Sequence, residues 1–128
     1  MKPFLHARVS VKRWGGKEED YQAIHDFIDS SKAHVPDMRH RAILHSSFGI
    51  YLTERVFGTN ITNSNGKLVS VRDIAEQHVI DDLGKIPTVA DYLDGMPIYS
   101  WLGGPKRVVK IFEWDGVSST DTVSPIVD

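Results

Sequence analysis

Three histidines lie where a folded chain could use them for chemistry. His25, His45 and His78 each fall on the apolar stripe of a different segment with helical periodicity. A buried imidazole needs a partner for both ring nitrogens, and an aspartate follows two of these histidines by one helical turn. These pairs are His25 with Asp29 and His78 with Asp82. We therefore expect imidazoles and carboxylates to meet inside the domain.

Three interpretations fit such a cluster. In the first, the cluster binds a divalent metal ion (Zn, Mn, Fe or Mg), which would lower the pKa of a bound water to about 7 and make it a nucleophile. The candidate ligands, which are also the candidate catalytic residues, are His25, His45, His78 and Asp82. In the second, the histidines are core residues that bond aspartates and backbone carbonyls. The third is a polar pocket without metal.

Basic residues precede His45 and could place an anionic substrate. Arg39, His40 and Arg41 are the candidate ligand-binding residues, since guanidinium groups suit phosphate. Arg41 and His45 are one helical turn apart, so we expect them to share a pocket. His40 is expected to be exposed, and His6 to lie at the surface or to pack against the first predicted helix. The three stripe histidines should be less exposed than His6.

Helices must position these side chains. The spacing predicts helices over 17–31, 36–57 and 71–83, with Gly58 and Gly84 ending the last two. The inward stripe of the second runs from Met38 through His45 to Val56.

Shorter elements complete the predicted fold. Residues 60–69 read as a hairpin because Asn65-Gly66 suits a tight turn, and 88–93 as a short helix. Residues 108–112 have strand character, and 116–128 should form a flexible tail. The expected fold is mainly α: one domain over 1–115, with three to four helices, a short β-hairpin and one C-terminal strand.

Composition excludes several classes of protein. The chain has 128 residues and no cysteine, so disulfides, thiolate metal sites and cysteine nucleophiles are excluded. Basic and acidic segments alternate, which favours internal charge pairing over a nucleic-acid-binding face. Because no apolar run approaches the roughly 20 residues that span a bilayer, and no secretory signal is evident, we expect a cytoplasmic protein without a membrane segment.

Many short stretches along residues 6–101 resemble one family. They are His6-Ala7, Trp14-Gly15-Gly16, Glu19-Asp20-Tyr21, Ile24-His25, Asp29-Ser30-Ser31-Lys32, Arg39-His40-Arg41-Ala42, His45, Phe57-Gly58, Asn63-Ser64-Asn65-Gly66-Lys67, Glu76-Gln77-His78-Val79, Asp82-Leu83-Gly84 and Ile86-Pro87. The chain thus resembles an uncharacterised family of small phage and bacterial proteins, a domain of unknown function, and looks most like the member encoded beside the tail-fibre chaperone in T4-like phages. The resemblance implies a phage or bacterial setting and no mechanism.

Two functions from different classes follow from these residues. The first is a metal-dependent hydrolase of a phosphate-containing small molecule, working through the His/Asp/Arg pocket. The alternative is a non-catalytic binding module that inhibits a host protein or sequesters a nucleotide signal. The sequence leaves the oligomeric state open.

Overall fold

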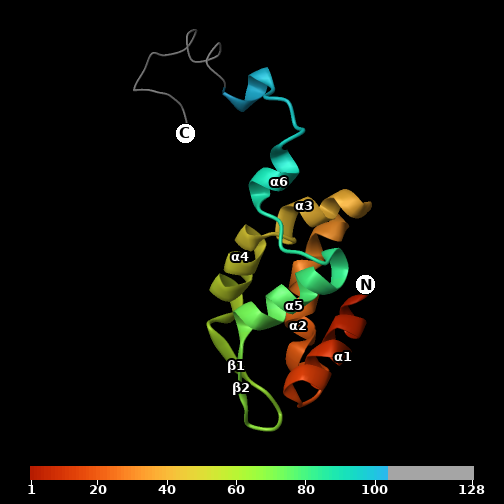
Figure 1. Ribbon diagram of the computed structural model, residues 1–128, viewed down its shortest axis with the longest axis vertical. Coiled ribbons are helices and arrows are strands. Elements are labelled where there is room, and N and C mark those ends of the chain that lie inside the picture. The colour runs from red at the N-terminus through yellow and green to blue at the C-terminus, as the bar shows by residue number, and fades with distance from the viewer. Residues whose placement is uncertain (104–128) are drawn as a thin grey trace. The chain divides into compact units, whose positions relative to one another are not determined.

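Helices account for most of residues 1–103, the part of the chain that the computed structural model describes, and this confirms the mainly α fold class (Figure 1). Residues 1–94 form one compact unit, and a second unit begins at Gly95 and contains a 3-10 turn, Ser100–Leu102. The predicted strand 108–112 and tail 116–128 lie outside the described residues. No helix within 1–103 is both long and apolar enough to cross a membrane.

The first helix, α1 (Pro3–Trp14), was not predicted. Its buried face consists of His6, Ala7 and Ser10, so it lacks the apolar stripe by which a helix is recognised in a sequence. Pro3 stands in the first turn, where its fixed φ favours helix. The predicted helix 17–31 is present as α2 (Glu19–Ile28), followed by a 3-10 turn, Ser30–Ala33.

The helix predicted over 36–57 is broken, and that prediction was wrong. It divides into a 3-10 turn (Met38–His40), α3 (Arg41–Leu44) and α4 (Ser47–Phe57). Ser46 is extended, and its hydroxyl accepts a hydrogen bond from the Gly49 N–H at 3.1 Å, which caps a new helix. The break shifts the helical phase, so Met38 and Val56 of the expected inward stripe are 67% and 58% exposed.

The hairpin and the two later helices follow the sequence prediction. Strand β1 (Asn60–Thr62) pairs antiparallel with β2 (Leu68–Ser70). Helix α5 (Val71–Leu83) begins at the Ser70 cap and ends at Gly84, whose φ of 74° favours glycine. A capping box of Thr88 and Asp91 begins α6 (Val89–Leu93).

Helix α5 is the central element of the first unit, with α1, α2 and α4 packed around it (Figure 1). Its amino-terminal half contributes Val71, Ile74 and Ala75 to the apolar core. Its carboxyl-terminal half adds Val79 to this core but also carries His78 and Asp82, whose side chains are at most 1% exposed. Buried polar groups are therefore present inside this unit beside the apolar core, mainly in the second half of α5.

Candidate metal centre

Two imidazoles and two carboxylates meet beside the carboxyl-terminal half of α5. His78 and Asp82 are one turn apart on α5, Asp29 follows the end of α2, and His45 lies at the break between α3 and α4. The side chains of all four are at most 6% exposed. Three separate stretches of sequence are thus needed to build the group, and each stretch presents its ligand at or next to a packed helix.

The distances within this group match those between the ligands of a metal ion. His78 Nε2 lies 3.3 Å from Asp29 Oδ1 and 3.4 Å from Asp82 Oδ2. His45 Nε2 lies 3.5 Å and 2.9 Å from the same two oxygens. Metal–ligand bonds of 2.0–2.1 Å in a tetrahedron separate the ligand atoms by about 3.3 Å. One ligand atom from each residue lies within 4.8 Å of all the others, so the four atoms can surround one ion.

The carboxylates of this group are held ionised. Burial opposes the charge on Asp82, but hydrogen bonds from His45, His6 and His78 outweigh it and hold its pKa far below the ordinary value. Burial likewise opposes the charge on Asp29, and a hydrogen bond from His78 outweighs it, so this pKa is lowered too. Positive groups already balance part of this charge from outside the group: the amino terminus of Met1 lies 2.9 Å from Asp82 Oδ1, and Lys32 Nζ lies 3.9 Å from Asp29 Oδ2. The other two oxygens, Asp29 Oδ1 and Asp82 Oδ2, face the imidazoles and could bind a cation between them.

The two imidazoles respond differently to these carboxylates. Burial lowers the pKa of His78, but its hydrogen bonds to Asp29 and Asp82 prevail, and the pKa is raised overall. For His45 burial is the dominant effect, and the pKa is lowered despite the hydrogen bond to Asp82. In the absence of an ion, the proton that balances the carboxylates therefore sits on His78. A metal ion bound by His78 Nε2 would take the place of that proton.

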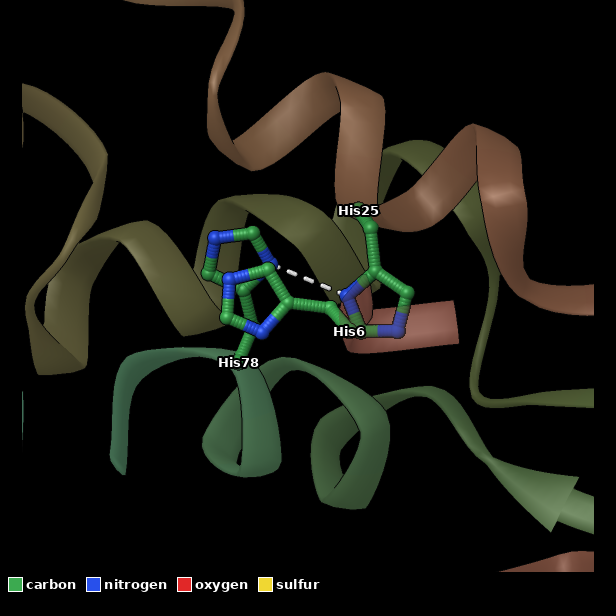
Figure 2. A group of neighbouring side chains, drawn as sticks. All are labelled: His6, His25 and His78. Carbon is green, nitrogen blue, oxygen red and sulfur yellow. Dashed lines mark hydrogen bonds between the residues drawn. The ribbon is translucent and has the colours of Figure 1, made fainter. Parts of the chain in front are cut away.

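A second imidazole contacts the opposite edge of His78. His25 Nδ1 lies 2.9 Å from His78 Nδ1 (Figure 2), and His25 Nε2 lies 2.8 Å from the Ser10 hydroxyl. Burial, together with the neighbouring His78 and His6, lowers the pKa of His25 to about 2, so its ring is neutral. His25 thus lies behind the four-residue group.

The ring of His6 stacks on the ring of His78. The two rings stack with centroids 3.7 Å apart and an interplanar angle of 22° (Figure 2). His6 Nδ1 lies 3.1 Å from Asp81 Oδ2, and His6 Nε2 lies 3.2 Å from Asp82 Oδ1. The expectation that His6 is more exposed than the stripe histidines was wrong, because α1 packs this face against α5 and His6 is fully buried.

A second group, His6, His25 and His78, has one ring nitrogen from each residue within 4.8 Å of the others, close enough for three ligands of a metal ion. Imidazole lone pairs lie in the ring plane, and stacked rings direct them along nearly parallel planes instead of toward one point. The lone pair between His25 and His78 is already used in their hydrogen bond. These three histidines therefore suit a packed, hydrogen-bonded support better than a second ion.

The basic candidates divide into one residue at the cluster and one outside it. Arg41 is 18% exposed, and its terminal nitrogen lies 3.8 Å from Asp82 Oδ1. Arg39 is 86% exposed and pairs with Asp37 of its own turn. His40, expected to be exposed, is buried: its ring packs edge-on against His45, and its Nδ1 lies 3.1 Å from the Ser31 hydroxyl. Arg41 alone of the three has a charged partner in the cluster.

The structure thus brings together His45, His78 and Asp82, with Arg41 at the edge, and places His25 one contact further away. Asp29, noted in the sequence as a neighbour of His25, contacts His78 and His45 instead. Sequence reasoning missed the supporting residues His6, Ser10, Gln77 and Asp81. The signal for Gln77 and Asp81 was their place beside His78 and Asp82 on one helix, whereas His6 and Ser10 required α1 to be recognised.

Comparison with known proteins gives a family and no activity. Neither a curated protein nor a solved structure matches the chain. One family model matches residues 1–102, which include every residue of the cluster. The chain belongs to this family, which is described as a domain of unknown function (DUF6915).

Proposed function

We propose that this domain binds one divalent transition-metal ion through His45, His78, Asp29 and Asp82. The observation that carries the proposal is the set of four nitrogen–oxygen distances, from 2.9 to 3.5 Å, between two imidazoles and two ionised carboxylates. Without a metal ion, the two carboxylates are met inside the group by hydrogen bonds from His45 and His78, of which His78 alone has a raised pKa. With one, all four groups satisfy their charge and lone pairs at once.

The donor set selects among metals. Two imidazole nitrogens with two carboxylate oxygens suit Zn²⁺, Fe²⁺ or Mn²⁺, while Mg²⁺ and Ca²⁺ prefer all-oxygen sites. The four nitrogen–oxygen distances are close to the ligand spacing of a tetrahedral zinc site, and this favours Zn²⁺ among the three. We therefore expect zinc to bind most tightly in vitro.

Elemental analysis tests this proposal. Protein purified without chelator should contain close to one equivalent of metal per chain, and Zn²⁺ should raise the melting temperature of chelator-treated protein. His78→Ala should abolish both, whereas His34→Ala is the matched control because His34 is exposed. Fresh wild-type protein without metal, whose melting temperature does not respond to divalent ions, would refute the proposal. It would favour the non-catalytic alternative, a module that binds a host protein or a nucleotide signal.

A second candidate function is hydrolysis of a phosphate-containing small molecule at this ion. The favouring observation is Arg41, whose partly exposed guanidinium lies beside the proposed ligand Asp82. The buried Nε of Arg41 has no hydrogen-bond partner among residues 1–103. A guanidinium next to a metal could hold a phosphoryl oxygen while the ion takes water as an additional ligand. The resemblance to small phage and bacterial proteins supports a phage-infected or bacterial cytoplasm as the setting.

Zinc- or manganese-loaded protein assayed on nucleotides, phosphomonoesters and phosphodiesters tests the hydrolase. Arg41→Ala should lower kcat/KM by about 10-fold or more, because the guanidinium that holds the phosphoryl oxygen is lost. Because Arg41 also lies 3.8 Å from the buried Asp82 carboxylate, the variant should lose up to about 3 kcal/mol of stability as well, so turnover is compared at full metal loading and well below its melting temperature. Arg39→Ala is the control, since Arg39 pairs with Asp37 outside the cluster. Equal loss in both variants, or no turnover by the loaded wild type, would contradict this second candidate.

A further inference from the structure

Hydrogen bonds link Gln77, Ser10, His25 and His78 in one chain, and the donor of each bond can be assigned in turn, beginning at Gln77. One end of the Gln77 amide faces the carbonyl oxygen of His6 at 3.1 Å and Asp81 Oδ2 at 2.6 Å. Both are acceptors, so the amide must present its NH2 group to them. Its carbonyl oxygen then faces the Ser10 hydroxyl, 2.5 Å away.

The contacts of the Ser10 hydroxyl then determine which atom donates to it. Two acceptors surround its hydroxyl: the carbonyl oxygen of Gln77 and, at 3.1 Å, the backbone carbonyl of His6. Neither can donate, and two oxygens at 2.5 Å need a hydrogen between them, so Ser10 donates to Gln77. The remaining neighbour, His25 Nε2 at 2.8 Å, must therefore be the donor to Ser10.

His25 in turn decides which nitrogen of His78 carries a proton. The ring of His25 is fully buried, and its nitrogens contact a hydroxyl and an imidazole without a carboxylate, so it is uncharged and holds one proton. With that proton on Nε2, its Nδ1 is an acceptor. His78 Nδ1 must then donate across the 2.9 Å contact (Figure 2).

We infer that Ser10, His25 and Gln77 are positioning residues, which fix the tautomer of His78 so that its Nε2 lone pair points at Asp29, Asp82 and the metal ion. This inference rests on the proposed metal binding. Metal-bound histidines usually donate their other ring N–H to a carboxylate or carbonyl, and here a neutral imidazole takes that place. The chain ends at the Asp81 carboxylate, which anchors the Gln77 amide.

The tautomers can be read directly by NMR. In long-range ¹H–¹⁵N spectra of wild-type protein, His25 should carry its proton on Nε2, both before and after addition of Zn²⁺. In the zinc-loaded protein, His78 should be protonated on Nδ1 and bound to the metal through Nε2. His25 protonated on Nδ1, or zinc bound to His78 Nδ1, would overturn the inference without any variant being made.

A matched pair of variants tests the consequence for affinity. Ser10 and Thr53 are both fully buried, and each hydroxyl contacts the backbone carbonyl four residues earlier. Ser10→Ala breaks the chain and should weaken Zn²⁺ binding by about 10- to 100-fold in competition with a chelator. Thr53→Val removes a comparable hydroxyl outside the chain and should leave zinc affinity within about 2-fold of wild type. A melt of each variant confirms folding.

These outcomes separate the inference from the metal proposal. Failure of the wild type to take up Zn²⁺ overturns the metal proposal and, with it, the positioning role. Normal uptake by the wild type, with Ser10→Ala binding zinc as tightly as Thr53→Val, overturns the positioning role alone. Loss of affinity confined to Ser10→Ala, with His25 protonated on Nε2, supports both.

Discussion

Helix α5 and the segment 36–57 both bring a histidine to the cluster, but they do so in opposite ways. Helix α5 is continuous, and its regular turn places His78 and Asp82 on one face. The segment 36–57 places His45 by ending one helix and beginning another, with His45 itself at φ −86° and ψ 62°. One ligand pair is thus a product of helical periodicity, and the other ligand is a product of its interruption.

The difference teaches where each ligand's position is determined. The ring of His78 is held by contacts on both edges, from His25 and from the carboxylates. His45 Nδ1 is buried without a hydrogen-bond partner among the described residues, and its backbone carbonyl accepts a bond from the Tyr92 hydroxyl at 2.8 Å. Both ring nitrogens of His78 are therefore held by side chains, whereas the ring of His45 is hydrogen-bonded through Nε2 alone and its backbone is tied to Tyr92.

The largest effect is expected from Asp82 on the continuous helix. Asp82→Asn removes the charge that faces His45, His78 and His6, and should lower the free energy of unfolding of metal-free protein by about 3 kcal/mol, because it breaks a buried ionic network. Urea unfolding in the presence of chelator measures this. Asp26→Asn, at an exposed position, is the control. Equal small losses in both would show that Asp82 does not organise the cluster.

Gly49→Ala tests the break between α3 and α4. A Cβ at Gly49 would collide with the carbonyl oxygen of Leu44 across the break, so the variant should lose about 3 kcal/mol. It should also weaken zinc binding, since the backbone that holds His45 must shift.

The sign of this change distinguishes the broken helix from a continuous one. In an uninterrupted helix, alanine in place of Gly49 would stabilise by about 1 kcal/mol. Gly95→Ala is the control, because a Cβ there would meet nothing within 4 Å. A melting temperature that rises in Gly49→Ala would show that residues 36–57 form one helix after all.

The same contrast explains how far the sequence could predict the structure. Helix α5 combines an apolar stripe with a serine cap and a closing glycine, and each signal points to the same element. In 36–57 the apolar spacing continues across the break, and Ser46 was the signal against continuity, since it caps α4 through Gly49. The prediction of one continuous helix therefore placed Met38 and Val56 on the buried face, where they do not lie, although it placed His45 there correctly.

The candidate site was predictable only as far as its residues share a helix. The burial of His25, His45 and His78 and the pairing of His78 with Asp82 were expected. Which carboxylate completes the group was not, because Asp29 contacts residues 16 and 49 positions away in the chain, at distances that tertiary packing alone sets. The contacts of His6 and Ser10 could not be predicted, because the face that α1 buries is largely polar and gives no apolar stripe.

Titration should also distinguish the two histidines in metal-free protein. The raised pKa of His78 means that its contribution to stability is present below the ordinary value of 6.5 and is lost as pH rises through the folded-state pKa. The lowered pKa of His45 means that its contribution is present above 6.5 and is lost as pH falls toward the folded-state pKa. NMR titration should thus find His78 deprotonating at a higher pH than His45. The reverse order would contradict the assignment of the shared proton to His78.

X-ray absorption spectroscopy of protein loaded with one equivalent of Zn²⁺ tests the metal centre most directly. The account predicts four ligands at about 2.0–2.1 Å, of which two are imidazoles and two are carboxylates. It further predicts that the imidazole signal falls to one in His45→Ala, if that variant still binds zinc. A spectrum with three imidazoles would place the ion at His6, His25 and His78 instead, and a spectrum of zinc coordinated by water alone would contradict the centre altogether.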